Sequence, residues 1–337
     1  MRNVIFNENA LRFLKSKVSR SQYRDLWDKD LVVLVNMNDS IYGLINNKVK
    51  NMLVYMFWAY LLAYLSDSVT DFINTGGAWN FRGYPLRSNL EVNASSAYVV
   101  FGTRTDEPAF DQYSLLGRNT ALEGSAITPA IILEADKRRL RFGRVSAGAV
   151  SEVGLYQVVY DTYPYTHEIM LGRTVYSVPG SGYNVYYDVI VKAPFLDNLA
   201  YYLFGLLSDT NQNLKRRDGT VVTARTSGDA NASTLYLFIG TSNTPFSFDQ
   251  YDLTNALALT SVHYFTWSRS TYVMIILSGA VRLATSMTIG EVGFAQRIAD
   301  IGGYLNEVLL GRIPLSTPIS KSAGDVFSTV ITFYAGK

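Results

Sequence analysis

Four glutamates and two arginines are the residues of this chain whose types and spacing could support acid–base chemistry. They are Glu152, Glu168, Glu291 and Glu307, with Arg173 and Arg312. General acid catalysis, as in a glycan hydrolase, requires two carboxylates that face one cleft and have separated pKa values. The alternative is a structural ion pair between neighbouring strands, or the anchoring of a loop. Because the residues lie in otherwise apolar segments, we predict pairs of Glu152 with Arg173 and of Glu291 with Arg312.

The two histidines, His167 and His263, give no comparable signal. Neither lies near a cluster of Cys, His or carboxylate residues with metal-ligand spacing, and loop or strand-face positions are expected for both. No nucleophile elbow, phosphate loop or dinucleotide fingerprint is present. The sequence therefore predicts a protein that is not an enzyme, with no catalytic residue, cofactor or metal ligand.

A calcium loop is the remaining metal hypothesis. Asp106, Glu107 and Asp111 could supply several oxygen ligands within a short span. A second copy of the same stretch has Thr244 and Pro245 in place of the first two residues. The loss of two carboxylates argues against calcium binding.

Three sequons are formal acceptors for N-glycosylation, and they begin at Asn38, Asn93 and Asn231. An asparagine before a strand is more often a turn residue. No apolar leader segment follows the polar, acidic first residues, so secretion through a cleaved signal is not expected. We therefore expect turn positions rather than glycans.

The candidate residues lie within a long internal repeat. Residues 93–103 and 231–241 share an Asn-Ala-Ser start and a Gly-Thr end, and Gly102 corresponds to Gly240 at an offset of 138 (240 − 102). The Glu-Val-Gly motif at Glu152 returns at Glu291, an offset of 139 (291 − 152). A period this long indicates a duplicated domain rather than a solenoid. We predict two copies, copy 1 (49–194) and copy 2 (195–337), after an N-terminal arm (1–48).

Composition limits the classes of partner. Apolar residues make up 48% of the chain, which is ample for packed cores, whereas charged residues make up only 17%. A net charge of +2 leaves no electrostatic footprint for nucleic acid. The absence of cysteine excludes disulfides. The longest apolar run, 52–65, is shorter than the roughly 18 to 20 residues that span a bilayer, so no membrane crossing is expected.

Each copy is expected to open with a buried helix and continue as strands. Residues 51–65 and 195–207 are apolar on nearly all sides, which is typical of a helix between other layers. Such a helix either fills its own copy or packs on a neighbouring subunit. About six or seven short strands with frequent turns then indicate a β-sandwich of Greek-key or jelly-roll type. Hairpins are expected at 130–145 and 262–277.

The N-terminal arm has no counterpart in the repeat. Residues 9–28 predict a polar amphipathic helix, and residues 31–35 form a short apolar run. An isolated helix of that length is marginal in water, so the apolar residues need a surface to bury against. We expect the arm to bind another chain; the alternative is that it folds back onto copy 1.

The order of the motifs resembles virion structural proteins of tailed phages and some archaeal viruses. The motifs in copy 1 are the Gly-Thr stretch 101–115, the Glu-Val-Gly-Leu stretch 151–156 and the Leu-Gly-Arg stretch 171–179. The resemblance covers about residues 50–336, taken twice. Gly-Thr-Arg-Thr stands at Gly102, where that family often has Gly-Thr-Gly-Thr.

The resemblance implies a capsid, vertex or tail protein that is located in the virion. It implies self-association into a homo-oligomer and contacts with other virion proteins. The alternative function is an adhesin on the virion that binds a host surface glycan or protein receptor. A glycan hydrolase that uses paired glutamates is a third hypothesis.

Overall fold

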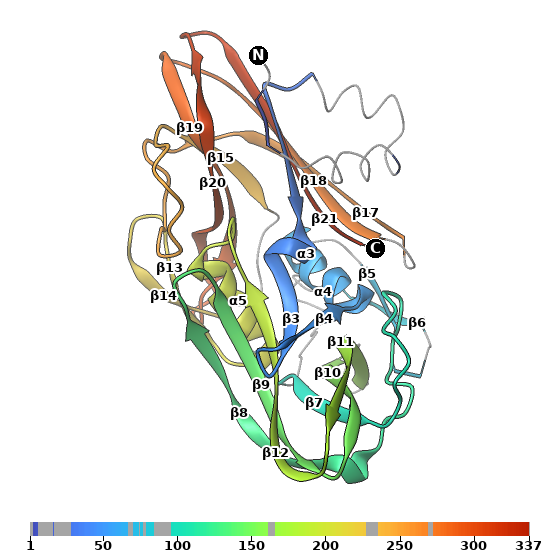
Figure 1. The fold of residues 1–337 in the computed structure, drawn as a ribbon. Helices are drawn as coiled ribbons and strands as arrows, with labels where there is room; N and C mark the ends of the chain where they lie inside the picture. Colours follow the sequence, from blue (N-terminus) through green and yellow to red (C-terminus); the bar gives the residue numbers. More distant parts are fainter. Residues whose placement is uncertain are drawn as a thin grey trace.

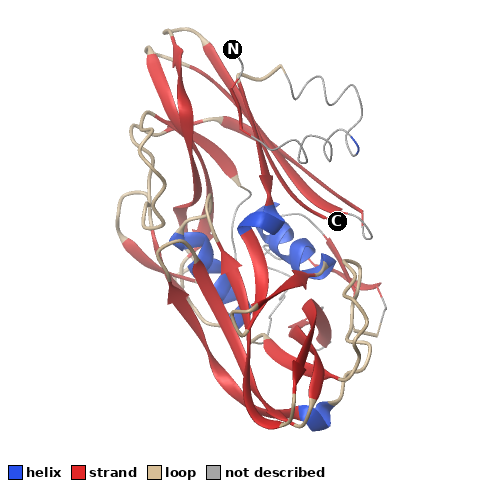
Figure 2. Cartoon of the chain, in the orientation of Figure 1, coloured by secondary structure: helices blue, strands red, loops and turns tan. Residues whose placement is uncertain are grey.

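The computed structural model describes residues 3–5, 16, 28–66, 70–73, 75–76, 79–83, 96–160, 166–226, 235–268 and 272–336. The chain is mainly β with a few short helices, as the sequence predicts (Figures 1 and 2). The N-terminal elements are β1 (Asn3–Ile5), β2 (Leu31–Asn36), α3 (Met37–Ser40), β3 (Ile41–Ile45), β4 (Val49–Leu53), α4 (Tyr55–Ser66), β5 (Thr70–Ile73) and β6 (Trp79–Gly83).

Copy 1 continues with β7 (Tyr98–Gly102), the 3-10 turn η1 (Thr120–Leu122), β8 (Glu123–Leu133), β9 (Arg138–Ala147), β10 (Val150–Tyr160), β11 (Thr166–Val178) and β12 (Ser181–Val191). Copy 2 contains α5 (Asp197–Ser208), β13 (Gln212–Lys215), β14 (Val221–Ala224), β15 (Tyr236–Gly240), β16 (Leu257–Ala258), β17 (Thr260–Ser268), β18 (Tyr272–Arg282), β19 (Met287–Ala299), β20 (Leu305–Lys321) and β21 (Val326–Gly336). The two predicted hairpins form, as β8–β9 and β17–β18.

The motif strands of the two copies pair in the same order and register. The orders are β7-β10-β11 and β15-β19-β20. The facing residues are Gly102–Glu152 and Gly154–Arg173 in copy 1, and Gly240–Glu291 and Gly293–Arg312 in copy 2. Both β10 and β19 also carry register irregularities at corresponding places, immediately before the glutamate and after Leu155 or Phe294. The predicted equivalence of Gly102 with Gly240 and of Glu152 with Glu291 is confirmed.

The remaining strands of each copy also correspond. Strand order β12-β9-β8 in copy 1 matches β21-β18-β17 in copy 2. Within each copy the first motif strand packs on this second set, since β7 contacts β8 and β9 while β15 contacts β17 and β18. The same pair of strand sets is therefore in contact in both copies.

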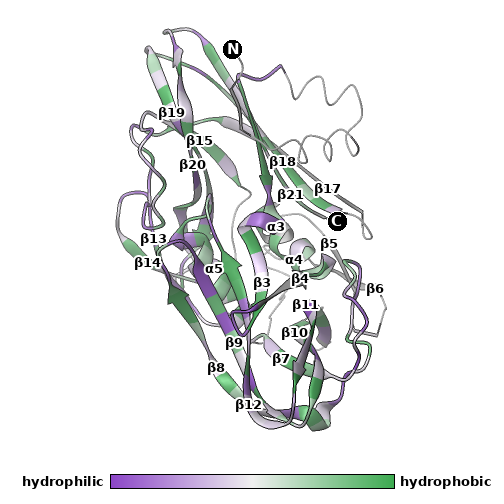
Figure 3. Cartoon of the chain, in the orientation of Figure 1, coloured by the Kyte–Doolittle hydropathy of each residue, from purple (hydrophilic) through white to green (hydrophobic). Residues whose placement is uncertain are grey.

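Residues 31–45 are part of the sheets, so the prediction of an arm that leaves the body is wrong for this stretch. Strand β2 runs parallel to β21, from Leu31 opposite Thr329 to Asn36 opposite Tyr334. Strand β3 pairs with β12 of copy 1 instead, and β4 then joins β3 to β11. β2 is coloured mainly as hydrophobic in Figure 3, and its residues Leu31, Val32, Val33 and Val35 are buried.

The physical reason is that the edge of each copy's sheet offers unpaired backbone groups to an apolar strand. The unpaired backbone groups of an edge strand can pair with any extended segment, so no sequence motif identifies this pairing. The helix predicted over 9–28, with Phe13, Leu14 and Trp27, falls almost entirely outside the described residues.

The two long helices begin on their own copy and end on the other copy. At the start, Val54 N–H donates to Leu171 O (3.1 Å) and Leu196 N–H donates to Leu310 O (2.9 Å). At the end the partners are exchanged: Leu235 N–H of copy 2 donates to Leu65 O of α4 (3.1 Å), and Ala97 N–H of copy 1 donates to Leu207 O of α5 (2.6 Å). Consistent with this exchange, α4 contacts β18 and α5 contacts β9. The copies are thus connected through both helices.

Buried apolar residues of both copies form one continuous cluster. It includes Trp58 on α4, Phe204 on α5, and residues from the sheets of each copy. Phe204 lies 6.2 Å from Phe142 of β9, measured between ring centroids, so α5 packs an aromatic contact against copy 1. The copies therefore share a core that neither could complete alone.

We expect the intact protein to unfold in a single cooperative transition, and fragments 1–194 and 195–337 to lack one when produced separately. Fragment 1–194 loses α5 from its surface at β9, and fragment 195–337 loses β2 and α4 from β21 and β18. Each fragment would expose apolar surface that the other covers. Differential scanning calorimetry and circular dichroism measure both quantities. Two separate transitions, or a cooperatively melting fragment, would show that the copies are independent.

Candidate functional site

Glu152 and Arg173 form a fully buried ion pair in copy 1, as predicted. Arg173 Nε lies 2.5 Å from Glu152 Oε1, and neither side chain is exposed to solvent. The same carboxylate accepts hydrogen bonds from Leu116 N (3.0 Å) and Gly117 N (3.1 Å) in the connection between β7 and β8. The pair therefore anchors a loop to the sheet, so both of the predicted structural roles are fulfilled together.

Copy 2 repeats this arrangement. Arg312 Nε donates to Glu291, which also accepts from Thr254 N (2.7 Å) in the loop after β15. A glutamine supports each arginine: Gln112 Oε1 accepts from Arg173 Nη1 at 3.0 Å, and Gln250 Oε1 accepts from Arg312 Nη1 at 3.1 Å. We call each set of glutamate, arginine and glutamine a clamp.

The clamps differ at the terminal nitrogens of the arginine, since Arg312 Nη1 also donates to Pro245 O (3.2 Å). Arg312 Nη2 donates to Thr244 O (3.1 Å) and to Thr244 Oγ1 (3.2 Å), whereas Arg173 Nη2 is buried without a hydrogen-bond partner among the described residues. Asp106 occupies the position of Thr244 in copy 1 and pairs in solvent with Arg104 at 2.9 Å. The hydrogen bond from Arg104 lowers the pKa of Asp106. The loop of copy 2 thus covers its arginine with polar groups that copy 1 lacks.

Glu168 and Glu307 belong to other networks. Glu168 accepts hydrogen bonds from Tyr98 Oη, from Arg118 Nη1 (2.6 Å) and from Thr75 Oγ1 (3.2 Å). Burial raises the pKa of the Tyr98 hydroxyl, and the bond to Glu168 raises it further. Glu307 accepts from Arg217 Nη1. Both glutamates are therefore ion-paired, with arginines other than Arg173 and Arg312.

The geometry of β10 and β11 separates Glu152 from Glu168. Glu168 lies opposite Val158, six residues (158 − 152) along β10 from Glu152. At about 3.3 Å per residue this is roughly 20 Å. The paired carboxylates of glycoside hydrolases lie about 5 to 9.5 Å apart. These two glutamates therefore do not form the hydrolase pair considered from the sequence.

The other sequence candidates are not brought together. His167 lies opposite Val159 on β10, and His263 lies opposite Leu277 on β18, in different copies. In the described part of the chain, no three histidine, aspartate or glutamate side chains gather closely enough to hold a metal ion, and this includes the proposed calcium loop. Asn38 lies in α3, whereas Asn93 and Asn231 fall outside the described residues.

Two short basic runs, 137–139 and 215–217, contain residues that form ion pairs. In the first run, Lys137 and Arg139 pair with Glu134, and Arg138 pairs with Asp197 across the copies. In the second run, Arg217 contacts Asp252 and Glu307. Arg138 also lies over the ring of Phe248, 4.0 Å from its centroid. Of these cations, Arg138 joins the two copies, whereas the other ion pairs lie within one copy.

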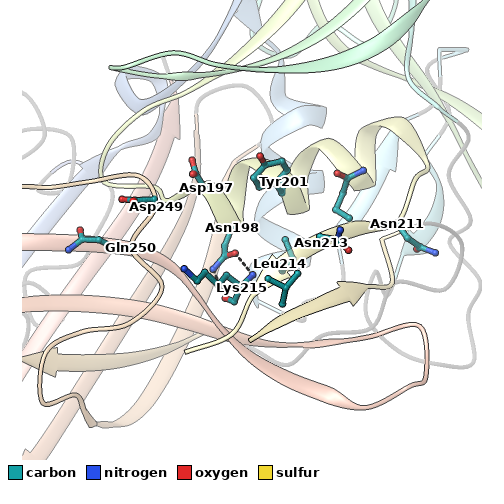
Figure 4. A pocket seen from close by; sticks show the side chains of 11 residues that line it. Asp197, Asn198, Tyr201, Asn211, Asn213, Leu214, Lys215, Asp249 and Gln250 are labelled. Carbon is teal, nitrogen blue, oxygen red and sulfur yellow. Dashed lines mark hydrogen bonds between the residues drawn. The ribbon is translucent and has the colours of Figure 1, made fainter. Parts of the chain in front are cut away.

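A pocket of about 470 Å³ opens beside the N-terminal end of α5. We call it the α5 pocket, and Figure 4 shows its side chains on α5, on β13 and on the loop after β15. The lining residues are Asp197, Asn198, Tyr201, Asn211, Gln212, Asn213, Leu214, Lys215, Val221, Asp249 and Gln250. Carboxylates, amides, a phenol and an ammonium group therefore surround one cavity.

Asn198 fixes the wall formed by β13. Its Nδ2 donates to Lys215 O (2.8 Å) and to Leu309 O (3.0 Å), and its Oδ1 accepts from Lys215 N (2.8 Å). The side chain is buried and its hydrogen-bonding capacity is used, so it positions the wall rather than a ligand. Figure 4 shows the short contact between Asn198 and Lys215.

The opposite wall is held by the copy 2 clamp. Gln250 lines the pocket and accepts the hydrogen bond from Arg312, so the clamp determines where this loop lies. Lys215 places its ammonium 3.9 Å from the centroid of the Tyr251 ring. Partial burial raises the pKa of Tyr201, and the neighbouring carboxylate of Asp197 raises it further. The pocket is thus assembled from rigid, mutually supported elements.

Sequence reasoning did not identify the α5 pocket. Its residues extend from Asp197 to Gln250 and belong to no known spacing pattern. A signal was nevertheless present: α5 begins with Asp197 and Asn198, where the corresponding helix α4 begins with the apolar pair Tyr55 and Met56. Because the two helices are otherwise similarly apolar, this polar start indicates that the first turn of α5 has different surroundings from the first turn of α4.

None of the helices in the described ranges is long and apolar enough to cross a membrane. No protein-family model matches the chain, and no curated protein matches it. Among solved structures, a 2'-deoxycytidine 5'-triphosphate deaminase from Agrobacterium tumefaciens aligns with 85% of this chain and 98% of its own, with 10% sequence identity and a TM-score of 0.13. A TM-score this low reflects no shared fold, so the alignment has no bearing on function.

Proposed function

We propose that this chain is a non-enzymatic structural component of a virus particle, in the capsid, vertex or tail. In this proposal each copy is a β-sandwich opened by a helix, and the protein acts through contacts with copies of itself and with other virion proteins. The observation that carries the proposal is the pair of clamps. The residues of the motifs that resemble virion proteins lock loops onto adjacent strands in both copies.

Such clamps suit a scaffold rather than a catalyst. The charged groups are buried and bonded within the protein, so their contribution is to loop position. Loops held in this way present constant surfaces to neighbouring subunits, which a closed symmetric assembly requires. The shared core and the exchanged helix ends add to this rigidity, because they prevent the copies from moving independently.

A rigid apolar surface is available for self-association at the loop between β19 and β20. Ile301, Tyr304 and Leu305 expose 57%, 76% and 52% of their surface. The loop is ordered by Asp300, whose Oδ1 accepts from Gly302 N (2.9 Å) and Tyr304 N (3.0 Å). Adjacent exposed apolar residues on an ordered loop are typical of a contact site.

We expect the purified protein to have a solution mass that is a multiple of 37.6 kDa, and to form regular assemblies in electron micrographs. The double variant Ile301→Asp, Tyr304→Asp should have a lower mass and an unchanged melting temperature, since both residues are exposed. Light scattering coupled to gel filtration measures the mass. Leu133→Asp is the control, because Leu133 on β8 is also a large exposed apolar residue, with 53% of its surface accessible. A parent protein that stays monomeric at high concentration would contradict the proposal.

A second candidate function, an adhesin on the virion, is favoured by a specific observation, the α5 pocket. Structural contacts between subunits do not need a polar cavity of this size.

A further inference from the structure

We infer that the α5 pocket binds a neutral carbohydrate. A protein that only assembles does not need such a pocket, so carbohydrate binding would be a function beside the proposed assembly role. Loss of either function would leave the other intact, because the pocket and the β19–β20 loop share no residue.

The charges of the pocket favour a neutral ligand. The carboxylate of Asp197 is already paired with Arg138 from copy 1. This leaves one carboxylate, Asp249, and one ammonium group, Lys215, among the lining residues. Their charges cancel, so a ligand with a strong net charge of either sign would gain little and would lose its hydration.

The polar groups favour a ligand with many hydroxyls. Gln212 Nε2 donates to Thr210, while Asn213 Oδ1 and Gln250 Oε1 accept from Thr223 and Arg312. The lining therefore offers a ligand the carbonyl of Gln212, the amide NH2 groups of Asn213 and Gln250, and the hydroxyl of Tyr201. Asp249 adds acceptors. A sugar hydroxyl donates one hydrogen bond and accepts others, so it can satisfy such a mixed lining, whereas an apolar ligand would leave these groups unpaired.

The apolar part of the lining suits the C–H face of a sugar ring. Leu214 is buried beneath the pocket, Val221 is exposed at its edge, and the Tyr201 ring is half-buried. The volume falls within the range of small-ligand sites, roughly 300 to 1,000 Å³, and accommodates a short oligosaccharide. The walls are fixed by Asn198 and by the clamp, which reduces the entropy lost on binding.

Copy 1 provides an internal comparison. At the corresponding place, Tyr55 and Met56 are almost completely buried, and the Tyr55 ring packs against Phe110 at 6.2 Å between centroids. Phe110 corresponds to Phe248, and Asp111 to Asp249, at the offset of 138 (248 − 110). The helix that begins at this repeat position therefore starts with buried apolar residues in copy 1 and with polar residues in copy 2.

Saturation-transfer NMR and calorimetry with the full-length protein test the inference, with a panel of neutral methyl glycosides as probes. We expect at least one to bind with a dissociation constant in the millimolar range, about 1 mM, as is usual for a single small polar ligand. Asp249→Ala combined with Asn213→Ala should weaken binding by roughly tenfold or more. Asp111→Ala, the matched change in copy 1, should leave the affinity unchanged.

Three results would overturn the inference. The first is that no neutral glycoside binds. The second is that the Asp249, Asn213 double variant, folded by its melting temperature, binds as well as the parent. The third is that only acidic sugars, such as N-acetylneuraminic acid, bind. Comparison of a free glycoside with the same sugar on a coated bead distinguishes a soluble saccharide from a surface glycan.

Discussion

The Glu152→Ala variant is expected to unfold with a free energy about 3 to 5 kcal/mol below that of the parent protein. Arg173 has no exposed surface, so the substitution leaves a buried guanidinium without its counter-charge. Leu116 N and Gly117 N lose their acceptor at the same time. Chemical denaturation followed by fluorescence measures the change.

The repeat supplies a second test of the same expectation. Glu291→Ala should cost a similar amount, because Arg312 is equally buried and Glu291 holds Thr254 N in the same way. Asp106→Ala is the control, because Asp106 forms an exposed pair with Arg104 and should change stability little. A Glu152→Ala variant that melts with the parent would contradict the clamp as a source of stability.

A double variant separates the charge from the loop anchor. Replacing the whole pair, as Glu152→Leu with Arg173→Met, removes both buried charges, and such replacements are often neutral or stabilising. Here we expect only partial recovery relative to Glu152→Ala, because the two loop N–H groups still lack an acceptor. Full recovery would show that the loop bonds contribute nothing.

Deletion of residues 1–48 is expected to prevent folding, which reverses the sequence-based expectation that the truncated protein melts nearly normally. The deletion removes seven almost fully buried apolar side chains, which are Leu31, Val32, Val33, Val35, Met37, Ile41 and Ile45. At roughly 1.5 to 3 kcal/mol each, their burial contributes on the order of 10 to 20 kcal/mol. That equals or exceeds the total stability of a typical protein, about 5 to 15 kcal/mol.

A point variant tests the same strand without a truncation. Val33 lies on β2, is 2% exposed and packs in the main apolar cluster. Val33→Asp places a carboxylate there and should unfold the protein or lower its melting temperature sharply. Asp39→Asn, at an exposed position on α3 in the same segment, is the control and should have little effect. A truncated protein that retains a normal melting curve would show that β2 is dispensable and would restore the arm hypothesis.

The sequence by itself determined the duplication, the β class and the two Glu–Arg ion pairs, whereas the glutamine of each clamp came only from the structure. Each clamp joins a glutamate and an arginine 21 residues apart on adjacent strands, so the contact is local in the chain. The repeat also presents it twice, and burial in apolar strands leaves a charged residue few options besides an oppositely charged partner. Local pattern and elementary electrostatics were sufficient for these features.

Only the tertiary structure decided where residues 31–45 lie, how the helices cross between copies, and that a pocket forms at α5. Asp30 accepts a hydrogen bond from Ser328 N, 298 residues away, and the strands that follow pair through backbone groups that every residue carries. An apolar run such as 31–35 shows that it must be buried but not against which edge. The α5 pocket joins residues of a helix, a hairpin and a loop whose polar side chains are individually ordinary. Their proximity results from long-range packing, which no local spacing encodes.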